Sequence, residues 1–172
     1  MSIRTGFALA AGASFLIATA QAQAPAPQPT ASAGPPPQYG VSLDPPTAKK
    51  AAAAAIAEAS KIGSAPDAVA IVNTGGYLVY FERMDNTQIG SVQVAIDKAR
   101  AAVLYRRPTK VFEDIVAGGG AGLRILAIHD AIPIDGGVPL IIGGKVVGAI
   151  GASGGTAQQD GQVAQAGASA LK

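Results

Sequence analysis

The segment VPLIIGGKVVGAIGA, residues 138–152, carries the clearest structural signal in this chain of 172 residues. Two β-prone runs, 138–142 and 145–152, flank the pair Gly143-Gly144. Glycine readily adopts the positive φ that a two-residue turn between antiparallel strands requires. The segment therefore predicts a β-hairpin.

A second hairpin is predicted closer to the N-terminus. The apolar run 68–73 and the β-rich run 77–83 are separated by Thr74-Gly75-Gly76, which is typical of a turn. Strands joined by hairpins pair antiparallel, so the sheet should be mainly antiparallel. Helical patterns before, between and after the hairpins indicate the α+β class, with helices layered on the sheet.

The helices are predicted from apolar spacing and from residues that begin or end helices. Thr47 is the expected N-cap of an Ala-rich helix ending near Gly63, and Ser91 is the expected N-cap of a helix that Pro108 ends near residue 105. Thr109 should cap a short helix to about residue 116. The glycine-rich run 118–122 is expected to be irregular, and 123–128 to be a short strand.

A last helix is expected to begin after Thr156, because Thr156 and Gln159 have the spacing of a capping box. It should continue to about Leu171.

The N-terminal region has two different compositions. Residues 1–22 read as a cleavable signal peptide, with Arg4, an uncharged apolar run at 6–20 and small residues before a cut after Ala22. Residues 23–46 are rich in Pro, Ala and Gln and are expected to form a disordered tether. The domain should occupy 47–172, and export implies a periplasmic or secreted protein with no membrane span after cleavage.

Composition excludes several classes of function. The chain has no cysteine, so disulfides, thiolate nucleophiles and cysteine-rich zinc sites are absent. The formal net charge is only +2, and the basic residues are not interleaved with aromatic ones, so nucleic-acid binding is not expected.

Residues 151–155, GASGG, match the G-x-S-x-G pattern of a serine nucleophile. In that fold the histidine follows the serine in the chain, whereas the single histidine, His129, precedes Ser153. Serine hydrolysis is therefore not expected. Two interpretations remain open: a glycine-rich loop that binds a carboxylate or phosphate at a helix N-terminus, or a tight turn.

His129 is the one candidate metal ligand. A lone histidine without cysteine cannot build a zinc site, but it can serve as an axial ligand to a haem iron. The alternative is an ordinary surface histidine. Arginine and lysine side chains could bind ligand carboxylates; the basic residues concentrate at Arg83, Lys98, Arg100, Arg106 and Arg107.

Several motifs together resemble the GlcG/HbpS family. They are Gly75-Gly76, Arg83-Met84-Asp85, Gly90-Ser91, Asp97-Lys98-Ala99, Arg107-Pro108-Thr109, the run 136–140, the run 147–154 and Gln159-Asp160. The resemblance covers about residues 47–171. It implies a profilin-like α-β-α domain around a mainly antiparallel sheet, homo-oligomers, and binding of haem or a related tetrapyrrole.

The resemblance also implies where a ligand would bind. The family's ligand-region positions fall on Arg83, Asp85, Lys98, Thr109, Ser153 and Asp160, with Thr109 near the haem. The predicted haem-binding residues are Arg83, Lys98, Thr109, His129, Ser153 and Gly154, with His129 as the metal ligand. Asn73 stands where the family commonly has aspartate, and His129 lies outside the shared motifs.

Two functional hypotheses follow. The first is a secreted or periplasmic haem-binding protein that takes part in haem handling or redox sensing. The second is a small enzyme or accessory protein acting on a small organic acid such as glycolate, with loop 151–155 holding the carboxylate and Asp85, Lys98 or Asp160 transferring protons. No coherent catalytic constellation is visible, which favours binding.

Overall fold

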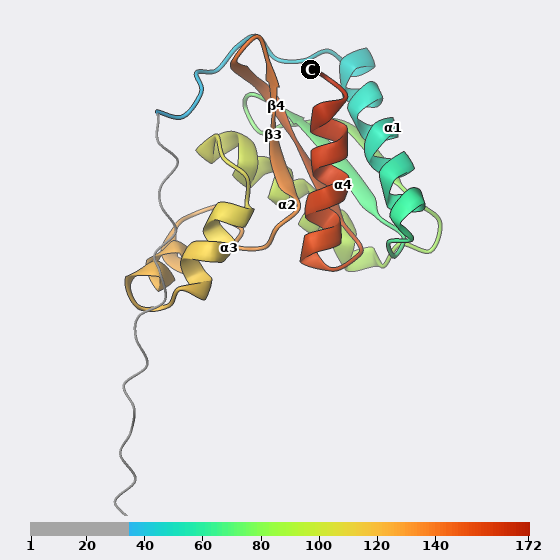
Figure 1. The fold of residues 1–172 in the computed structure, drawn as a ribbon. Helices are drawn as coiled ribbons and strands as arrows, with labels where there is room; N and C mark the ends of the chain where they lie inside the picture. The colour runs from blue at the N-terminus through green and yellow to red at the C-terminus, as the bar shows by residue number, and fades with distance from the viewer. Residues whose placement is uncertain (1–34) are drawn as a thin grey trace, which may run out of the picture.

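A computed structural model describes residues 35–172, which form an α+β domain (Figure 1). The signal-peptide prediction for 1–22 and the tether prediction for 23–34 lie outside the described residues. The helices are α1 (Pro45–Ile62), α2 (Ile89–Tyr105), α3 (Lys110–Ala117), the 3₁₀ helix η1 (Gly120–Ala127) and α4 (Ala157–Ser169). The strands are β1 (Ala68–Asn73), β2 (Leu78–Arg83), β3 (Gly137–Ile142) and β4 (Lys145–Ser153).

The four strands form one antiparallel sheet in the order β2-β1-β4-β3. Both predicted hairpins are confirmed, and Gly143 and Gly144 turn the second one with φ of 57° and 74°. The hairpins meet through β1 and β4, where Ala68 pairs with Ser153. This pairing of β1 with β4 joins the two hairpins into one sheet.

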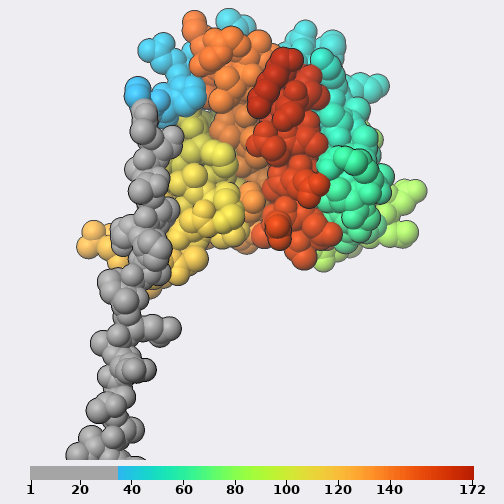
Figure 2. All heavy atoms as spheres, viewed as in Figure 1, coloured from blue at the N-terminus to red at the C-terminus, as the bar shows by residue number. Residues whose placement is uncertain are grey.

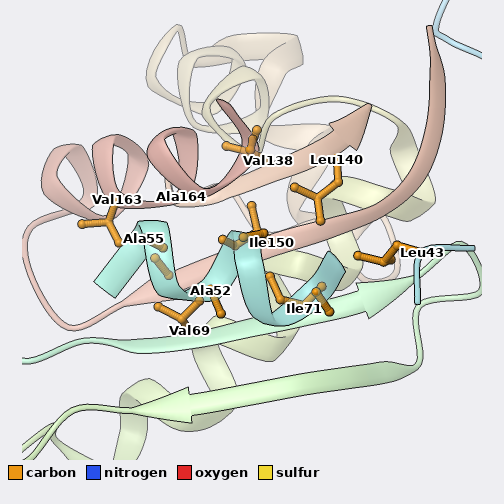
Figure 3. Close-up of a cluster of buried hydrophobic side chains, with 14 of the residues drawn as sticks. Leu43, Ala52, Ala55, Val69, Ile71, Val138, Leu140, Ile150, Val163 and Ala164 are labelled. Atoms are coloured by element: carbon orange, nitrogen blue, oxygen red, sulfur yellow. The ribbon is translucent and has the colours of Figure 1, made fainter. Parts of the chain in front are cut away.

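Helices cover both faces of the sheet, as the α-β-α prediction requires (Figure 1). Side chains alternate between faces along a strand, and in β1 Val69 and Ile71 pack with α1 and α4 whereas Val72 packs with α2. Figure 3 shows the first of these clusters, in which Ile150 of β4 lies among the alanines of α1. Figure 2 shows α1 and α4 side by side on the surface.

Helix α2 lies unusually close to the sheet because glycines face it. A β-carbon built on Gly151 would lie 2.0 Å from the carbonyl oxygen of Ala95, and one built on Gly137 would lie 2.3 Å from that of Lys98. Ordinary side chains at these two strand positions would push α2 outward. The close packing therefore fixes the position of Lys98 relative to the sheet.

Two helices begin earlier than predicted. Asp44, not Thr47, caps α1, since its side chain accepts a hydrogen bond from the Thr47 backbone N–H at 2.9 Å. Pro45 fits the first helical position because its φ is already helical and its missing N–H has no partner there. Helix α2 begins at Ile89 after Gln88, so Ser91 lies inside it.

The strand predicted at 123–128 is wrong, because the chain there forms the 3₁₀ helix η1. Gly119 and Gly120 have φ of 65° and 54°, which turns the chain back directly after α3. Local bonds such as Gly122 N–H to the Gly119 carbonyl then occupy backbone groups that a strand would offer to a neighbour.

The last part of the expected tether is ordered against the domain. Strand β4 extends past β1, whose pairing ends at Asn73 with Gly148. Gly40 donates to the carbonyl oxygen of Val146, and Val146 donates to that of Gln38, each at 2.8 Å. The segment around residues 38–40 therefore pairs with β4 before the predicted domain start at residue 47. Figure 2 shows this blue segment against the orange β3–β4 turn.

Among residues 35–172, no helix combines the length and the apolar character needed to cross a bilayer.

Candidate functional site

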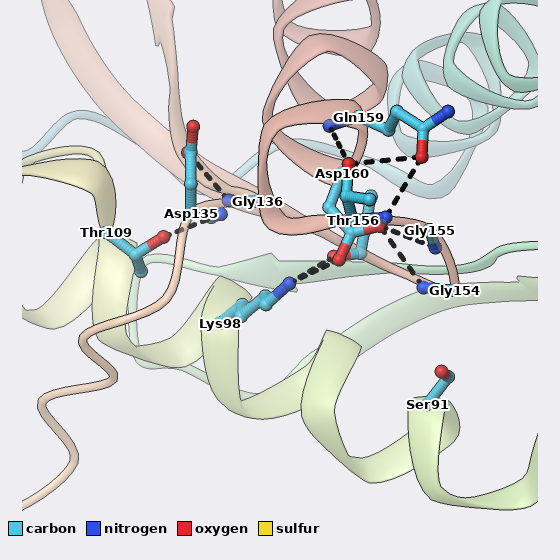
Figure 4. A network of polar contacts seen from close by, with 12 residues as sticks. Ser91, Lys98, Thr109, Asp135, Gly136, Gly154, Gly155, Thr156, Gln159 and Asp160 are labelled. Atoms are coloured by element: carbon cyan, nitrogen blue, oxygen red, sulfur yellow. Dashed lines mark hydrogen bonds and ion pairs between the residues drawn. The ribbon is translucent and has the colours of Figure 1, made fainter. Parts of the chain in front are cut away.

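A buried ion pair joins α2 to α4 (Figure 4). Lys98 Nζ lies 2.7 Å from Asp160 Oδ2, and the two side chains are 1% and 4% exposed. Lys98 Nζ also donates to the carbonyl oxygen of Ala152 at 3.1 Å. A charge removed from water requires such partners, so Lys98 is held by both the sheet and α4.

The second oxygen of Asp160 occupies the glycine-rich loop between β4 and α4. Asp160 Oδ1 accepts hydrogen bonds from the N–H groups of Gly154 at 3.2 Å and Gly155 at 2.9 Å. This is the anion position expected at a helix N-terminus, and the chain fills it with its own carboxylate. The loop is therefore a structural connection rather than an open carboxylate site.

The predicted capping box at the start of α4 is confirmed. The Thr156 side chain accepts from the Gln159 backbone N–H at 3.3 Å, and the Gln159 side chain accepts from the Thr156 backbone N–H at 3.0 Å. These bonds hold Asp160 in the first turn of α4, directly beside the loop.

Thr109 is fully buried and links α3 to the start of β3. Its hydroxyl oxygen accepts from Gly137 N–H at 2.9 Å, and its own N–H donates to the Gly137 carbonyl at 2.9 Å. Its side chain makes no capping bond to α3. In this conformation the Thr109 side chain has no exposed surface, and the contacts it makes link α3 to β3.

Asp135 and Glu113 extend the polar cluster beyond the residues predicted from sequence. Glu113 Oε2 accepts from Asp135 N–H, and Asp135 Oδ1 accepts from Gly136 N–H, both at 2.7 Å. Burial, followed by the negative charge of Glu113, raises the pKa of Asp135. In the sequence, the adjacent run 136–140 was noted only for the family resemblance, and nothing there indicated that this carboxyl group is buried.

Asp67 is another buried carboxyl group that was not predicted from the sequence. It directly precedes β1 and is fully buried, and burial together with the charge of Asp160 raises its pKa to about 6. In the sequence, Asp67 stands between Pro66 and an apolar strand, where an aspartate usually belongs to an exposed loop. Only the pairing of β1 with β4 places it beside Gly154 and Asp160.

The other predicted site residues divide between two places. Ser153 is buried at the end of β4 and Gly154 follows it, so both belong with Lys98 and Asp160. Arg83 is exposed at the end of β2, and within residues 35–172 neither Arg83 nor His129 has a hydrogen bond or ion pair with this buried cluster.

His129 lies in an exposed apolar part of the domain, residues 118–134, which we call the η1 lobe. Helix η1 buries none of its residues. The large apolar side chains exposed in the lobe are Leu123 at 50%, Leu126 at 63%, Ile128 at 41% and Ile134 at 45%. These four exposed side chains within one short stretch make the lobe a candidate surface for an apolar ligand.

The imidazole of His129 is 92% exposed but is held in place. Its Nδ1 lies 3.0 Å from Asp130 Oδ2, and that oxygen also pairs with Arg100 at 3.4 Å. The hydroxyl group of Tyr105 donates to the His129 carbonyl oxygen. The contact at Nδ1 leaves Nε2 available to a ligand, with a carboxylate orienting the ring from behind.

Comparison with known proteins identifies relatives over nearly the whole domain. The family model described as "Haem degrading protein HbpS-like" matches residues 43–169. An uncharacterized 15.0 kDa protein of Citrobacter freundii, from the dhaT-dhaS intergenic region, is 36% identical over 115 residues, covering 66% of this chain and 80% of that protein. Protein GlcG of Escherichia coli K12 is 35% identical over 85 residues, covering 49% of this chain and 62% of GlcG.

Solved structures agree with the fold. Klebsiella pneumoniae protein ORFY has a TM-score of 0.71 at 27% identity, covering 81% of this chain and 97% of its own. A double mutant of Streptomyces reticuli HbpS has a TM-score of 0.70 at 31% identity, covering 86% and 99%. The PduOC–haem complex has a TM-score of 0.68 at 29% identity, covering 77% and 96%.

Proposed function

This chain belongs to the HbpS-like family, and from that premise we propose that it binds haem on the η1 lobe, with His129 as an iron ligand. Haem is a flat apolar ring with two carboxylates at one edge and an iron that accepts axial ligands. A protein site must therefore offer apolar contact, a cation and a ligating side chain. The η1 lobe offers all three.

The observation that carries the proposal is an exposed His129 in a segment that also exposes four large apolar side chains. Histidine ligands commonly donate the second ring N–H to a carboxylate, which orients the ring and increases its basicity. In this chain Asp130 places a carboxylate oxygen 3.0 Å from His129 Nδ1. Arg124, exposed on η1 itself, supplies a cation for a haem carboxylate. Bound haem would supply an iron centre, and the chain's own residues would orient the ligand and cover the ring.

Two of the comparisons support haem as the ligand. The family description names haem degradation, and the related PduOC structure is a complex with haem. Binding is the step that handling, sensing and degradation of haem have in common, so the proposal does not depend on which of them follows.

A titration of the purified full chain with haemin, followed at the Soret band, tests the proposal. Wild type should give a saturable, shifted band. His129→Ala should change the band position and weaken binding by about tenfold or more, since a ligand to iron is lost. Tyr77→Ala, which removes another exposed ring on the β1–β2 turn, should leave the titration unchanged.

The possible outcomes test haem binding and the role of His129 separately. Absorbance that never saturates in wild type would refute haem binding. Saturable binding with identical spectra for wild type and His129→Ala would refute His129 as the iron ligand while leaving haem as the ligand.

The organic-acid alternative has less support. It relied on loop 151–155 to bind a substrate carboxylate, but Asp160 occupies the N–H groups of Gly154 and Gly155. Lys98 is likewise engaged by Asp160 and buried. We therefore do not propose it as a function.

We further propose that haem binding takes place outside the cytoplasm, on the basis of the signal-peptide pattern at residues 1–22. Mass spectrometry of the protein from its native cell envelope tests this. Cleavage after Ala22 should give a mature chain beginning at Gln23; an intact Met1 in the cytoplasmic fraction would contradict it.

A further inference from the structure

Asp67 is a buried carboxyl group that lies close to the Ser64 hydroxyl group and to Gly155. Both of its oxygens are sealed from solvent and have no partner among residues 35–172, and the same is true of the hydroxyl oxygen of Ser64. Backbone bonds fix the residue itself: Thr87 Oγ1 and Met84 N–H both donate to the Asp67 carbonyl oxygen, at 3.1 Å and 3.0 Å. These bonds fix the backbone at Asp67, and its side chain lies fully inside the packed domain.

The loop between β4 and α4 lies directly over this carboxyl group. A β-carbon built on Gly154 would lie 2.8 Å from Asp67 Oδ1, and one built on Gly155 would lie 2.5 Å from Ser64 Oγ. The same glycines donate their N–H groups to Asp160. Asp67 and Asp160 thus lie on either side of one short loop.

The charges around this loop do not balance if every acid is ionised. Lys98 on α2 is the one cation in the cluster, and it is paired with Asp160 on α4. Asp135, before β3, also feels the charge of Lys98, and its pKa is itself raised by burial. The turn that follows β2 packs on Asp67 through Met84 and Thr87, neither of which is charged. Among residues 35–172, no ion pair or hydrogen bond brings a cation to Asp67.

We propose that Asp67 is protonated in the folded domain and that it forms, with Asp160, a proton-dependent latch joining the start of β1 to the β4–α4 loop. A protonated carboxyl group is a hydrogen-bond donor, and an ionised neighbour is an acceptor. Loss of the proton leaves two carboxylates on opposite sides of Gly154 and Gly155. The loop 153–155 and the first turn of α4 then separate from β1, because repulsion replaces attraction.

The direction of the pH effect follows from the raised pKa. The pKa of Asp67 rises from 3.8 to about 6 on folding, because burial and then the charge of Asp160 oppose ionisation. The folded chain holds the proton more tightly than the unfolded chain, so the latch contributes its full stability below pH 3.8. That contribution is lost as the pH rises through about 6.

Equilibrium unfolding of the full chain in urea, measured between pH 4 and pH 8, tests the latch through Asp67→Asn. Asparagine keeps the shape and cannot ionise. In wild type, this one group should raise the unfolding equilibrium constant by about 60-fold between pH 4 and pH 7, because its pKa is 3.8 in the unfolded chain and about 6 in the folded chain. The pH dependence of Asp67→Asn should lack this component, and Asp85→Asn, an exposed aspartate on the neighbouring turn, should keep it.

The carboxyl carbon of Asp67, followed by NMR in the folded wild-type chain, provides a measurement that needs no variant. A titration midpoint above pH 5 supports the latch, and one at or below pH 4 overturns it. Identical pH profiles for wild type and Asp67→Asn would also overturn it. A wild-type stability that instead rises from pH 5 to pH 8 would mean that a bound cation neutralises the site, which equally contradicts a shared proton.

Discussion

Lys98 is the residue on which the polar interior depends. It is the largest fully buried side chain in the described domain, and its ammonium group contacts the ends of both β4 and α4. The motif Asp97-Lys98-Ala99 suggested a ligand-binding lysine, but its neighbour Asp97 interacts with Gln93 on the helix surface. Asp160, far along the chain, is the partner that neutralises Lys98.

Lys98→Ala should destabilise the domain by about 3 kcal/mol or more, because it leaves Asp160 buried without its cation. Urea unfolding at pH 7 measures this. Lys110→Ala is the matched control: its ion pairs with Glu113 and Asp114 are exposed, so the loss should be below about 1 kcal/mol. Equal losses in the two variants would contradict a special role for Lys98.

At the scale of elements, the contact between α2 and the sheet decides where the buried cluster forms. The small residues Ala95 and Ala99 on α2 face Gly151 on β4. The helix approaches closely enough for Lys98 to reach the carbonyl oxygen of Ala152. The glycines of β4 are therefore part of the site's construction, although they carry no chemistry.

Gly151→Ala should destabilise the domain by about 2 kcal/mol, since its new methyl group would lie 2.0 Å from the Ala95 carbonyl oxygen and must push α2 away. Gly90→Ala, in helix α2 itself, provides the control. A β-carbon at Gly90 would meet nothing within 4 Å, and alanine is a better helix former by up to about 1 kcal/mol. Thermal unfolding of both variants should shift in opposite directions; a neutral Gly151→Ala would show that α2 can move freely.

On the scale of the whole molecule, the segment before α1 connects distant parts of the domain. The Tyr39 hydroxyl group donates to the carbonyl oxygens of Val103 at 2.9 Å and Leu104 at 3.1 Å, at the end of α2. Arg106 lies 5.2 Å over the Tyr39 ring and donates to the Pro37 carbonyl oxygen. The residues before α1 thus join the end of α2 to the start of β4.

Tyr39→Ala should destabilise the full chain by about 2 kcal/mol, through lost hydrogen bonds and the lost contact of the Arg106 guanidinium with the ring. Tyr77→Ala, at a ring that is 74% exposed, should cost less than about 0.5 kcal/mol. Urea unfolding compares the two. A Tyr39→Ala variant as stable as Tyr77→Ala would mean that the segment merely lies on the domain.

Local sequence patterns determined the elements and the fold class. The two hairpins and the capping box at Thr156 depend only on near neighbours in the chain. Helix starts were less predictable, because both Asp44 and Thr47 are good caps and only Asp44 precedes the proline pair. The strand at 123–128 failed because i to i+3 bonds after Gly119 and Gly120 compete with sheet pairing.

The candidate sites required the tertiary structure, because their members are brought together by contacts between segments far apart in the chain. The antiparallel pairing of β1 with β4 sets Asp67 beside Gly154, and the packing of α2 and α4 sets Lys98 against Asp160. Sequence could name Lys98, Ser153 and His129 as candidates, since side-chain chemistry is local. It could not determine that Asp160 would fill the loop, that Thr109 would be sealed inside, or that His129 would stay exposed, because burial depends on the whole packed chain.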